Sequence, residues 1–208
     1  MSSNDVSGAI APNVVITGTD AATGAEAIAP EARGQSAPTQ TQYVPGTGVV
    51  DYDLQREVEV FLTRQAALLD AKDWQSFIDC FAPDGIYWMP VELSQTGWTH
   101  EPSIFAEDRL MMEIRMRRLQ HPNAWSQAPM WGTNHMVGNV IIESRTDSQI
   151  QVYSRFQMME LRRDDVRHFG GTYRHTLVRE NGELKVKLQR VDMMNGQATY
   201  NYVLQAWV

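Results

Sequence analysis

The sequence is poor in cysteine, in basic residues and in long apolar runs. One cysteine, Cys80, occurs among 208 residues, which excludes an internal disulfide and any cysteine-rich metal site. Lys and Arg number 18 against 25 Asp and Glu, a net charge of −7. This balance argues against nucleic-acid binding, which depends on basic side chains that neutralise phosphates.

Membrane and export signals are also missing. No stretch approaches the roughly 18 apolar residues that a membrane-spanning helix requires. The N-terminal region lacks a basic segment followed by a long apolar run, so it does not resemble a secretory signal. A chain with one cysteine is compatible with a reducing compartment, and we expect it in the cytoplasm.

The first 48 residues differ from the rest in composition. They are dominated by Ala, Gly, Ser, Thr, Pro and Gln, a composition typical of tails and linkers. We therefore predict a low-complexity N-terminal tail over residues 1–48, either a flexible leader or an arm that lies on a partner. Residues 49–208 are enough for one folded domain with one core.

The first half of this domain has helical spacing. Apolar residues from Leu54 to Leu69 recur on one face, and Asp51 or Asp53 can cap the helix start. A second helix is expected from Trp74 through Phe81, and Pro83-Asp84-Gly85 should end it. A strand follows over 86–91, where Pro90 favours an edge or a bulge, and a third helix is predicted over 104–119.

The second half reads as antiparallel strands over about 133–144, 149–162, 167–180 and 183–193. Asn181-Gly182 is a strong hairpin signal, because both residues tolerate positive φ. Gly170-Gly171 inside a strand predicts a bulge or a sharp bend. Helices followed by a bent meander predict an α+β domain in which a strongly curved sheet forms a cone with a pocket-like interior.

Residues for metal or nucleophilic chemistry do not form a recognisable set. The five histidines show no spacing typical of a two-histidine, one-carboxylate iron site, and a single cysteine cannot hold a Rieske cluster. We therefore assign no catalytic, cofactor-binding or metal-binding residue. Acid–base catalysis inside the cone stays open, because six polar residues could point inward: Asp79, Tyr87, His135, Tyr153, Arg155 and Tyr173.

Aromatic residues outside the periodic segments are the other unusual feature. Several tryptophans occupy polar loops or the apolar end of the sequence, and exposed aromatics of this kind mark protein contacts. The alternative is that the loops fold back and bury them. We predict interface roles for Trp98, Trp125, Trp131 and Trp207.

Several segments, in this order, resemble the small (β) subunits of aromatic-ring-hydroxylating dioxygenases. Their order and spacing agree over about residues 55–195. They are Ala66-Ala67-Leu68-Leu69-Asp70 with Trp74, Tyr87-Trp88-Met89-Pro90, Arg115-Met116-Arg117-Arg118-Leu119, Ala124-Trp125-Ser126-Gln127-Ala128-Pro129, His135-Met136-Val137-Gly138-Asn139-Val140, and Tyr173-Arg174 with Leu177, Asn181-Gly182, Lys185-Val186 and Asn195.

The resemblance implies a cone fold of the nuclear-transport-factor-2 (NTF2-like) and ketosteroid-isomerase type without its catalytic residues. It further implies a non-catalytic subunit in an α3β3 hexamer. The large (α) subunit would carry the Rieske [2Fe–2S] cluster and the mononuclear Fe(II), and separate reductase components would deliver electrons from NADH. Two alternatives are a stand-alone cone-fold isomerase or dehydratase acting on a small hydrophobic substrate, and a non-enzymatic ligand-binding cone.

Overall fold

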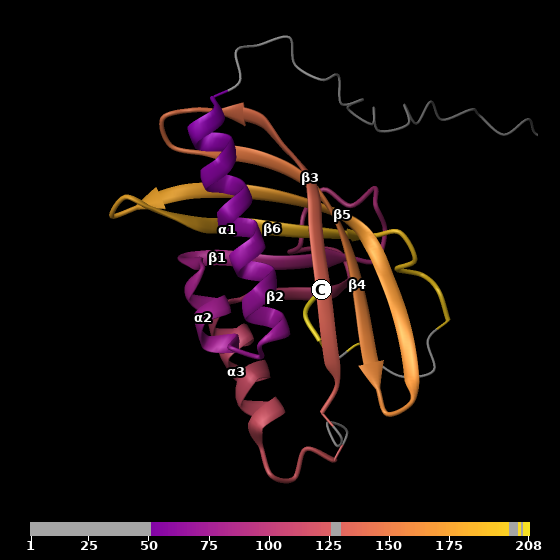
Figure 1. Cartoon of the computed structure of the whole chain (residues 1–208). Helices are drawn as coiled ribbons and strands as arrows, with labels where there is room; N and C mark the ends of the chain where they lie inside the picture. Colours follow the sequence, from indigo (N-terminus) through magenta and orange to yellow (C-terminus); the bar gives the residue numbers. More distant parts are fainter. Residues whose placement is uncertain (1–50, 126–129, 200–203, 205) are drawn as a thin grey trace, which may run out of the picture. The chain divides into compact units, whose positions relative to one another are not determined.

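The computed structural model describes residues 51–125, 130–199, 204 and 206–208. The predicted tail over residues 1–48 lies outside them. Within the described part, three helices and six strands form one α+β unit (Figure 1). In chain order the elements are α1 (Tyr52–Asp70), α2 (Trp74–Asp79), β1 (Phe81–Pro90), β2 (Ser103–Asp108), α3 (Arg109–Gln120), β3 (Gly132–Arg145), β4 (Ile150–Arg162), β5 (Asp165–Glu180) and β6 (Glu183–Met193).

All six strands form a single sheet with the order β2-β1-β6-β5-β4-β3. The β1–β6 pair is parallel, and the other four pairs are antiparallel. The sheet is strongly curved, and α1 lies across its concave face (Figure 1). No helix among the described residues has the length and apolar character needed to cross a membrane.

Helix α1 is placed by a cap at its start and by one apolar stripe. The Asp51 carboxylate accepts a hydrogen bond from the Leu54 backbone N–H at 3.0 Å, which satisfies one of the free donors of the first turn. Leu54, Val58 and Leu62 are buried on the face toward the sheet. This stripe packs into the core that the concave side chains of the strands supply.

The four C-terminal strands match their predicted ranges to within two residues. The β5–β6 hairpin turns at Asn181 and Gly182, whose φ angles of 52° and 85° are both positive. The prediction made from this dipeptide is therefore confirmed. The alternation of buried and exposed residues along β4 shows that only one face of the sheet is covered at these strands.

Two predicted helices were partly wrong. Helix α2 ends at Asp79, and Phe81 is the first residue of β1 rather than the last turn of a helix. Residues 104–119 do not form one helix, because β2 occupies Ser103–Asp108 and α3 begins only at Arg109. The carboxylate of Asp108 accepts from the Met111 N–H at 2.8 Å and caps α3 at this boundary.

The predictions for proline and glycine in strands were half right. Pro90 lies at a register shift between β1 and β2, but β1 is an inner strand and not an edge. The β4–β5 register runs through Gly170 and Gly171 without a shift, so of the two predicted alternatives the bulge is absent there. Strand β5 does bend strongly along its length (Figure 1). Gly171 instead allows a close approach: a Cβ at this position would lie 2.1 Å from the Asp192 carbonyl oxygen.

Candidate functional site

A row of six paired residues crosses the concave face of the sheet from edge to edge. Strand register places each member opposite the next on the neighbouring strand. The first four carry polar groups, and those four are buried. The row is Glu107, Tyr87, Gln189, His175, Val152 and Ile142.

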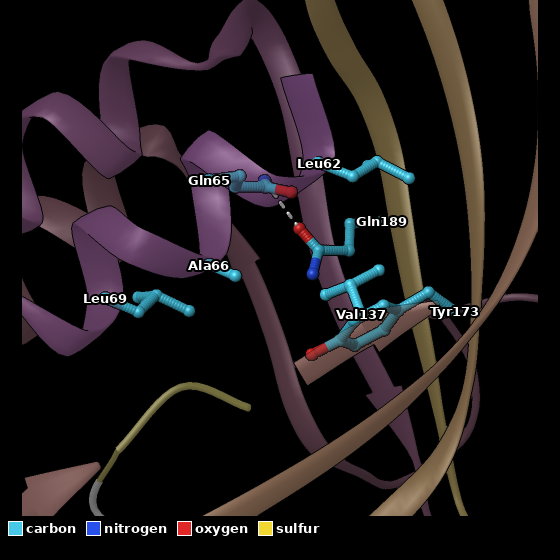
Figure 2. Close-up of a pocket in the computed structure, with 7 residues that line it drawn as sticks. All are labelled: Leu62, Gln65, Ala66, Leu69, Val137, Tyr173 and Gln189. Atoms are coloured by element: carbon cyan, nitrogen blue, oxygen red, sulfur yellow. Dashed lines mark hydrogen bonds between the residues drawn. The ribbon is translucent and has the colours of Figure 1, made fainter. Parts of the chain in front are cut away.

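The centre of this face holds one very small cavity, which α1 and the sheet line together (Figure 2). The Gln65 side-chain amide donates to the Gln189 side-chain oxygen at 2.9 Å across its wall. The cavity volume is about 10 Å³, roughly what one water molecule needs. An aromatic ring therefore does not fit. The lining residues are Leu62, Gln65, Ala66, Leu69, Val137, Tyr173 and Gln189.

Three buried titratable groups of the interior, His175, Tyr87 and Tyr173, are held in their neutral forms. Burial lowers the pKa of His175 to about 3, and the neighbouring Gln189 opposes this shift only in part. Neither ring nitrogen of His175 has a hydrogen-bond partner in the described part of the chain. Burial also raises the pKa of Tyr87 and the pKa of Tyr173 well above the usual tyrosine value.

A buried carboxylate at the edge of the row is already fully engaged. Glu107 accepts from Arg115 Nε at 2.7 Å through Oε1, and from the Trp207 indole N–H at 3.0 Å through Oε2. Arg115 also covers the Phe105 ring, with 4.3 Å between the guanidinium carbon and the ring centroid. Both oxygens of this carboxylate are therefore occupied by donors from the chain itself.

A second carboxylate forms a dyad with a buried histidine. Asp70, at the end of α1, accepts from the His135 backbone N–H at 2.9 Å, and its other oxygen lies 2.6 Å from His135 Nδ1. Burial opposes ionisation of Asp70, but the hydrogen bonds from His135 outweigh it and lower the Asp70 pKa. This dyad joins α1 to β3 and is not among the residues that line the cavity.

The six residues predicted to point inward are therefore separated. Tyr87, His135 and Tyr173 are buried on the concave side, whereas Asp79 is exposed and pairs with Arg109 at 2.9 Å. Arg155 is also exposed, and Tyr153 is half-buried beneath Arg174. Sequence patterns did not single out Gln65, Gln189 or Glu107, because Gln65 bonds Gln189 124 positions away and Glu107 accepts from residue 207. His175 was considered only as one of the five histidines.

The described residues contain no group of three or more His, Cys, Asp or Glu side chains placed to hold a metal ion. Cys80 is half-buried, and its thiol donates to the Ser76 carbonyl oxygen at 3.4 Å. Burial raises the pKa of this thiol, which keeps it protonated and weakly nucleophilic.

The four tryptophans predicted at an interface occupy two kinds of environment. Trp125 is 81% exposed and Trp98 is 37% exposed, so both can reach a partner. Trp131 and Trp207 are buried within the chain itself. Trp131 and Trp207 therefore pack inside the subunit. An interface role for any of the four tryptophans stays a prediction.

The sequence model of the family described as ring hydroxylating beta subunit matches residues 64–198, more than half of the chain. The chain belongs to the ring hydroxylating beta subunit family. The resemblance in the sequence analysis is thereby confirmed, as is the interpretation of the chain as the β-subunit component of a dioxygenase.

Among curated proteins, the chain is 29% identical to the 2-halobenzoate 1,2-dioxygenase small subunit of Burkholderia cepacia. The alignment covers 144 residues, 67% of this chain and 87% of the relative. Among solved structures, it matches the β subunit of the benzoate 1,2-dioxygenase from Burkholderia mallei with a TM-score of 0.59 and 23% identity. That match covers 76% of this chain and 100% of the other.

A structural match outside the β subunits supports the fold prediction. A scytalone dehydratase-type protein from Novosphingobium aromaticivorans matches with a TM-score of 0.55 and 16% identity, over 74% of this chain and 91% of the other. At this identity the match shows the fold alone. Together these structures confirm the predicted α+β, NTF2-like cone.

Proposed function

We propose that this β subunit is the non-catalytic, structural component of a multicomponent Rieske oxygenase. The complex hydroxylates an aromatic ring with O2 and electrons that reductase components bring from NADH. The large (α) subunit supplies the Rieske [2Fe–2S] cluster and the mononuclear Fe(II), and three copies of each chain form an α3β3 hexamer. Its place is the cytoplasm, where NADH is available.

The observation that carries this proposal is that the described residues of α1 and the sheet nearly fill the space between them. An isomerase or dehydratase needs an acid and a base within hydrogen-bond reach of a bound substrate. Here the cavity holds about one water molecule, and the Glu107 carboxylate is occupied by Arg115 and Trp207. These features favour a structural role over the stand-alone enzyme and over the ligand-binding cone.

The surface supports the same proposal, because apolar side chains gather on the outer face of β3, β4 and β5. Met136, Met159, Leu161 and Val166 are between 46% and 67% exposed, and the strand register places them on adjoining strands. We call these four residues the outer patch. Contiguous exposed apolar groups mark protein interfaces, and a stable interface buries roughly 1,200–2,000 Å² in total.

Two further surfaces are proposed as subunit contacts. Leu110, Met111 and Ile114 are exposed along α3, and Trp98 and Trp125 lie between elements, before β2 and before β3 respectively. Residues 1–48, outside the described part, are proposed to be the low-complexity tail that their composition predicts.

Affinity purification of the tagged full chain from its native host tests the proposal. We expect a larger chain to co-purify that contains iron and has the visible absorption of a Rieske cluster, with a native mass that fits three copies of each chain. The isolated β subunit should be colourless. Stoichiometric iron in the isolated chain, or unaided turnover of a substrate by it, would contradict the structural role.

A further inference from the structure

The residues 206–208 are deeply buried although they follow the last strand. Ala206, Trp207 and Val208 are 5%, 2% and 0% exposed. The end of the chain lies on the face of the sheet that α1 covers (Figure 1). Its contacts come from α2, β1 and β2, so the segment lies against α2 and this edge of the sheet.

Two polar anchors hold the segment at defined atoms. The Tyr87 phenol donates to the Val208 backbone oxygen at 3.0 Å and accepts from the Val208 backbone N–H, also at 3.0 Å. The Trp207 indole N–H donates to Glu107 Oε2 at 3.0 Å. Arg115 holds the other oxygen of Glu107, so the carboxylate that accepts from the indole is oriented by a second partner.

Aromatic rings complete the surroundings of the Trp207 ring. Phe77 packs against it with 5.4 Å between ring centroids and a tilt of 36°. Phe77 also contacts Tyr87, edge to face, at 6.5 Å. The surroundings therefore combine an apolar aromatic wall with one anionic hydrogen-bond acceptor, which is the usual composition of a small-molecule site.

We propose that Trp207 is the internal occupant of an aromatic-binding site, and that this site selects a planar bicyclic ring that carries an N–H donor. The native chain fills the site with its own indole, so free aromatic molecules compete with a covalently attached ligand. Selectivity comes from Glu107, because an analogue without the N–H leaves a buried carboxylate oxygen without its donor. This inference is independent of the proposed function, since it concerns only contacts within the chain.

Replacement of the occupant by a free ligand tests the proposal. In the full chain, Trp207→Gly removes the ring and leaves Glu107, Arg115, Phe77 and Tyr87 in place. We expect added indole to raise the melting temperature of this variant with increasing concentration, and to bind at least tenfold more tightly than benzofuran, which has the same bicyclic shape without the N–H. Native protein and Trp125→Gly, whose ring was exposed, should show no such response.

Equal binding of indole and benzofuran, or no binding of indole by a folded Trp207→Gly chain, would overturn the proposal. If that variant does not fold, hydrogen exchange in the native chain decides. We expect the Trp207 indole N–H and the Val208 amide to exchange at least a hundredfold more slowly than in an unstructured peptide. Exchange at the peptide rate would show that the site does not hold this segment.

Discussion

Substitution of Gly171 by alanine should be far more harmful than substitution of its neighbour Gly170. A Cβ at position 171 would lie 2.1 Å from the Asp192 carbonyl oxygen and 3.0 Å from a Phe156 ring carbon. The oxygen belongs to the backbone of β6, so relief requires the β5–β6 pair to move apart by about 1 Å. At position 170 the nearest atom would be the Phe156 carbonyl oxygen at 3.6 Å, an ordinary contact.

Overpacking of this kind costs about 1–3 kcal/mol and occasionally more. We expect Gly171→Ala to reach the upper end, about 3 kcal/mol, because the obstructing atom is backbone. For a chain of this size each kcal/mol lowers the melting temperature by roughly 2–4 °C, so the loss should be about 6–12 °C. Gly170→Ala should stay within about 0.5 kcal/mol of the native chain.

Thermal unfolding of the two full-length variants, followed by circular dichroism under one buffer condition, measures this difference. Gly170→Ala is a matched control, because both positions are glycines in the same strand and neither has a positive φ. Backbone strain therefore does not distinguish the two variants. If the two variants unfold at the same temperature, the close approach of β5 to Asp192 is not the reason for a glycine at position 171.

Four further outcomes are expected. Tyr87→Phe leaves the buried Val208 N–H without its acceptor and should cost about 1–3 kcal/mol in urea unfolding, and native stability would show that this bond contributes nothing. His175 has a folded pKa of about 3 against about 6.5 in an unfolded chain, so below pH 6.5 the unfolded state binds the extra proton and stability is lost as pH falls. The slope should approach about 1.4 kcal/mol per pH unit and should flatten in His175→Leu; an identical slope in both proteins would assign it to other groups. Trp125→Ala should leave the melting temperature of the isolated chain unchanged and weaken assembly with the large subunit by about 2 kcal/mol. Trp131→Ala should instead destabilise the isolated chain by about 3–5 kcal/mol. The reverse pattern would contradict the core role of Trp131 and the interface role of Trp125.

The elements that sequence reasoning located well are those specified by local signals. The β5–β6 hairpin follows from Asn181-Gly182, since these two residues can both take the left-handed conformation that a tight turn requires. The start of α1 follows from Asp51 and the apolar stripe after it. In both places the deciding interactions lie within a few residues along the chain.

The elements that were misassigned depend on pairing partners. Residues from Ile104 to Asp108 have apolar spacing that fits a helix equally well, yet they form β2 because β1 offers an unpaired edge. Phe81 likewise joins β1 because Val186 of β6 lies opposite it. In each case a tertiary hydrogen-bond ladder outweighs the local preference.

The same distinction explains why the interior was only partly predicted. Tyr87, His135 and Tyr173 were among the six residues that could point inward, and they are buried. The Gln65–Gln189 bond joins residues 124 positions apart, and the partners of Glu107 come from α3 and residue 207. No spacing rule along the chain brings these groups together, since their distances depend on the curvature and register of the whole sheet.

The interior polar groups of this subunit are largely hydrogen-bonded within the chain, whereas apolar side chains are exposed on its surface. This distribution indicates that the subunit acts through its surface. On the concave side, Gln65 bonds Gln189, Tyr87 bonds Val208, and Glu107 is shared by two donors. A substrate would have to displace these internal partners before it met a reactive group. On the convex side, the outer patch leaves large apolar side chains in water, a cost that association with another chain removes. In this fold the interior polar groups named above bond to one another, and the exposed apolar surface lies on the convex side. Such a fold is suited to bind other chains and hold them in a fixed arrangement.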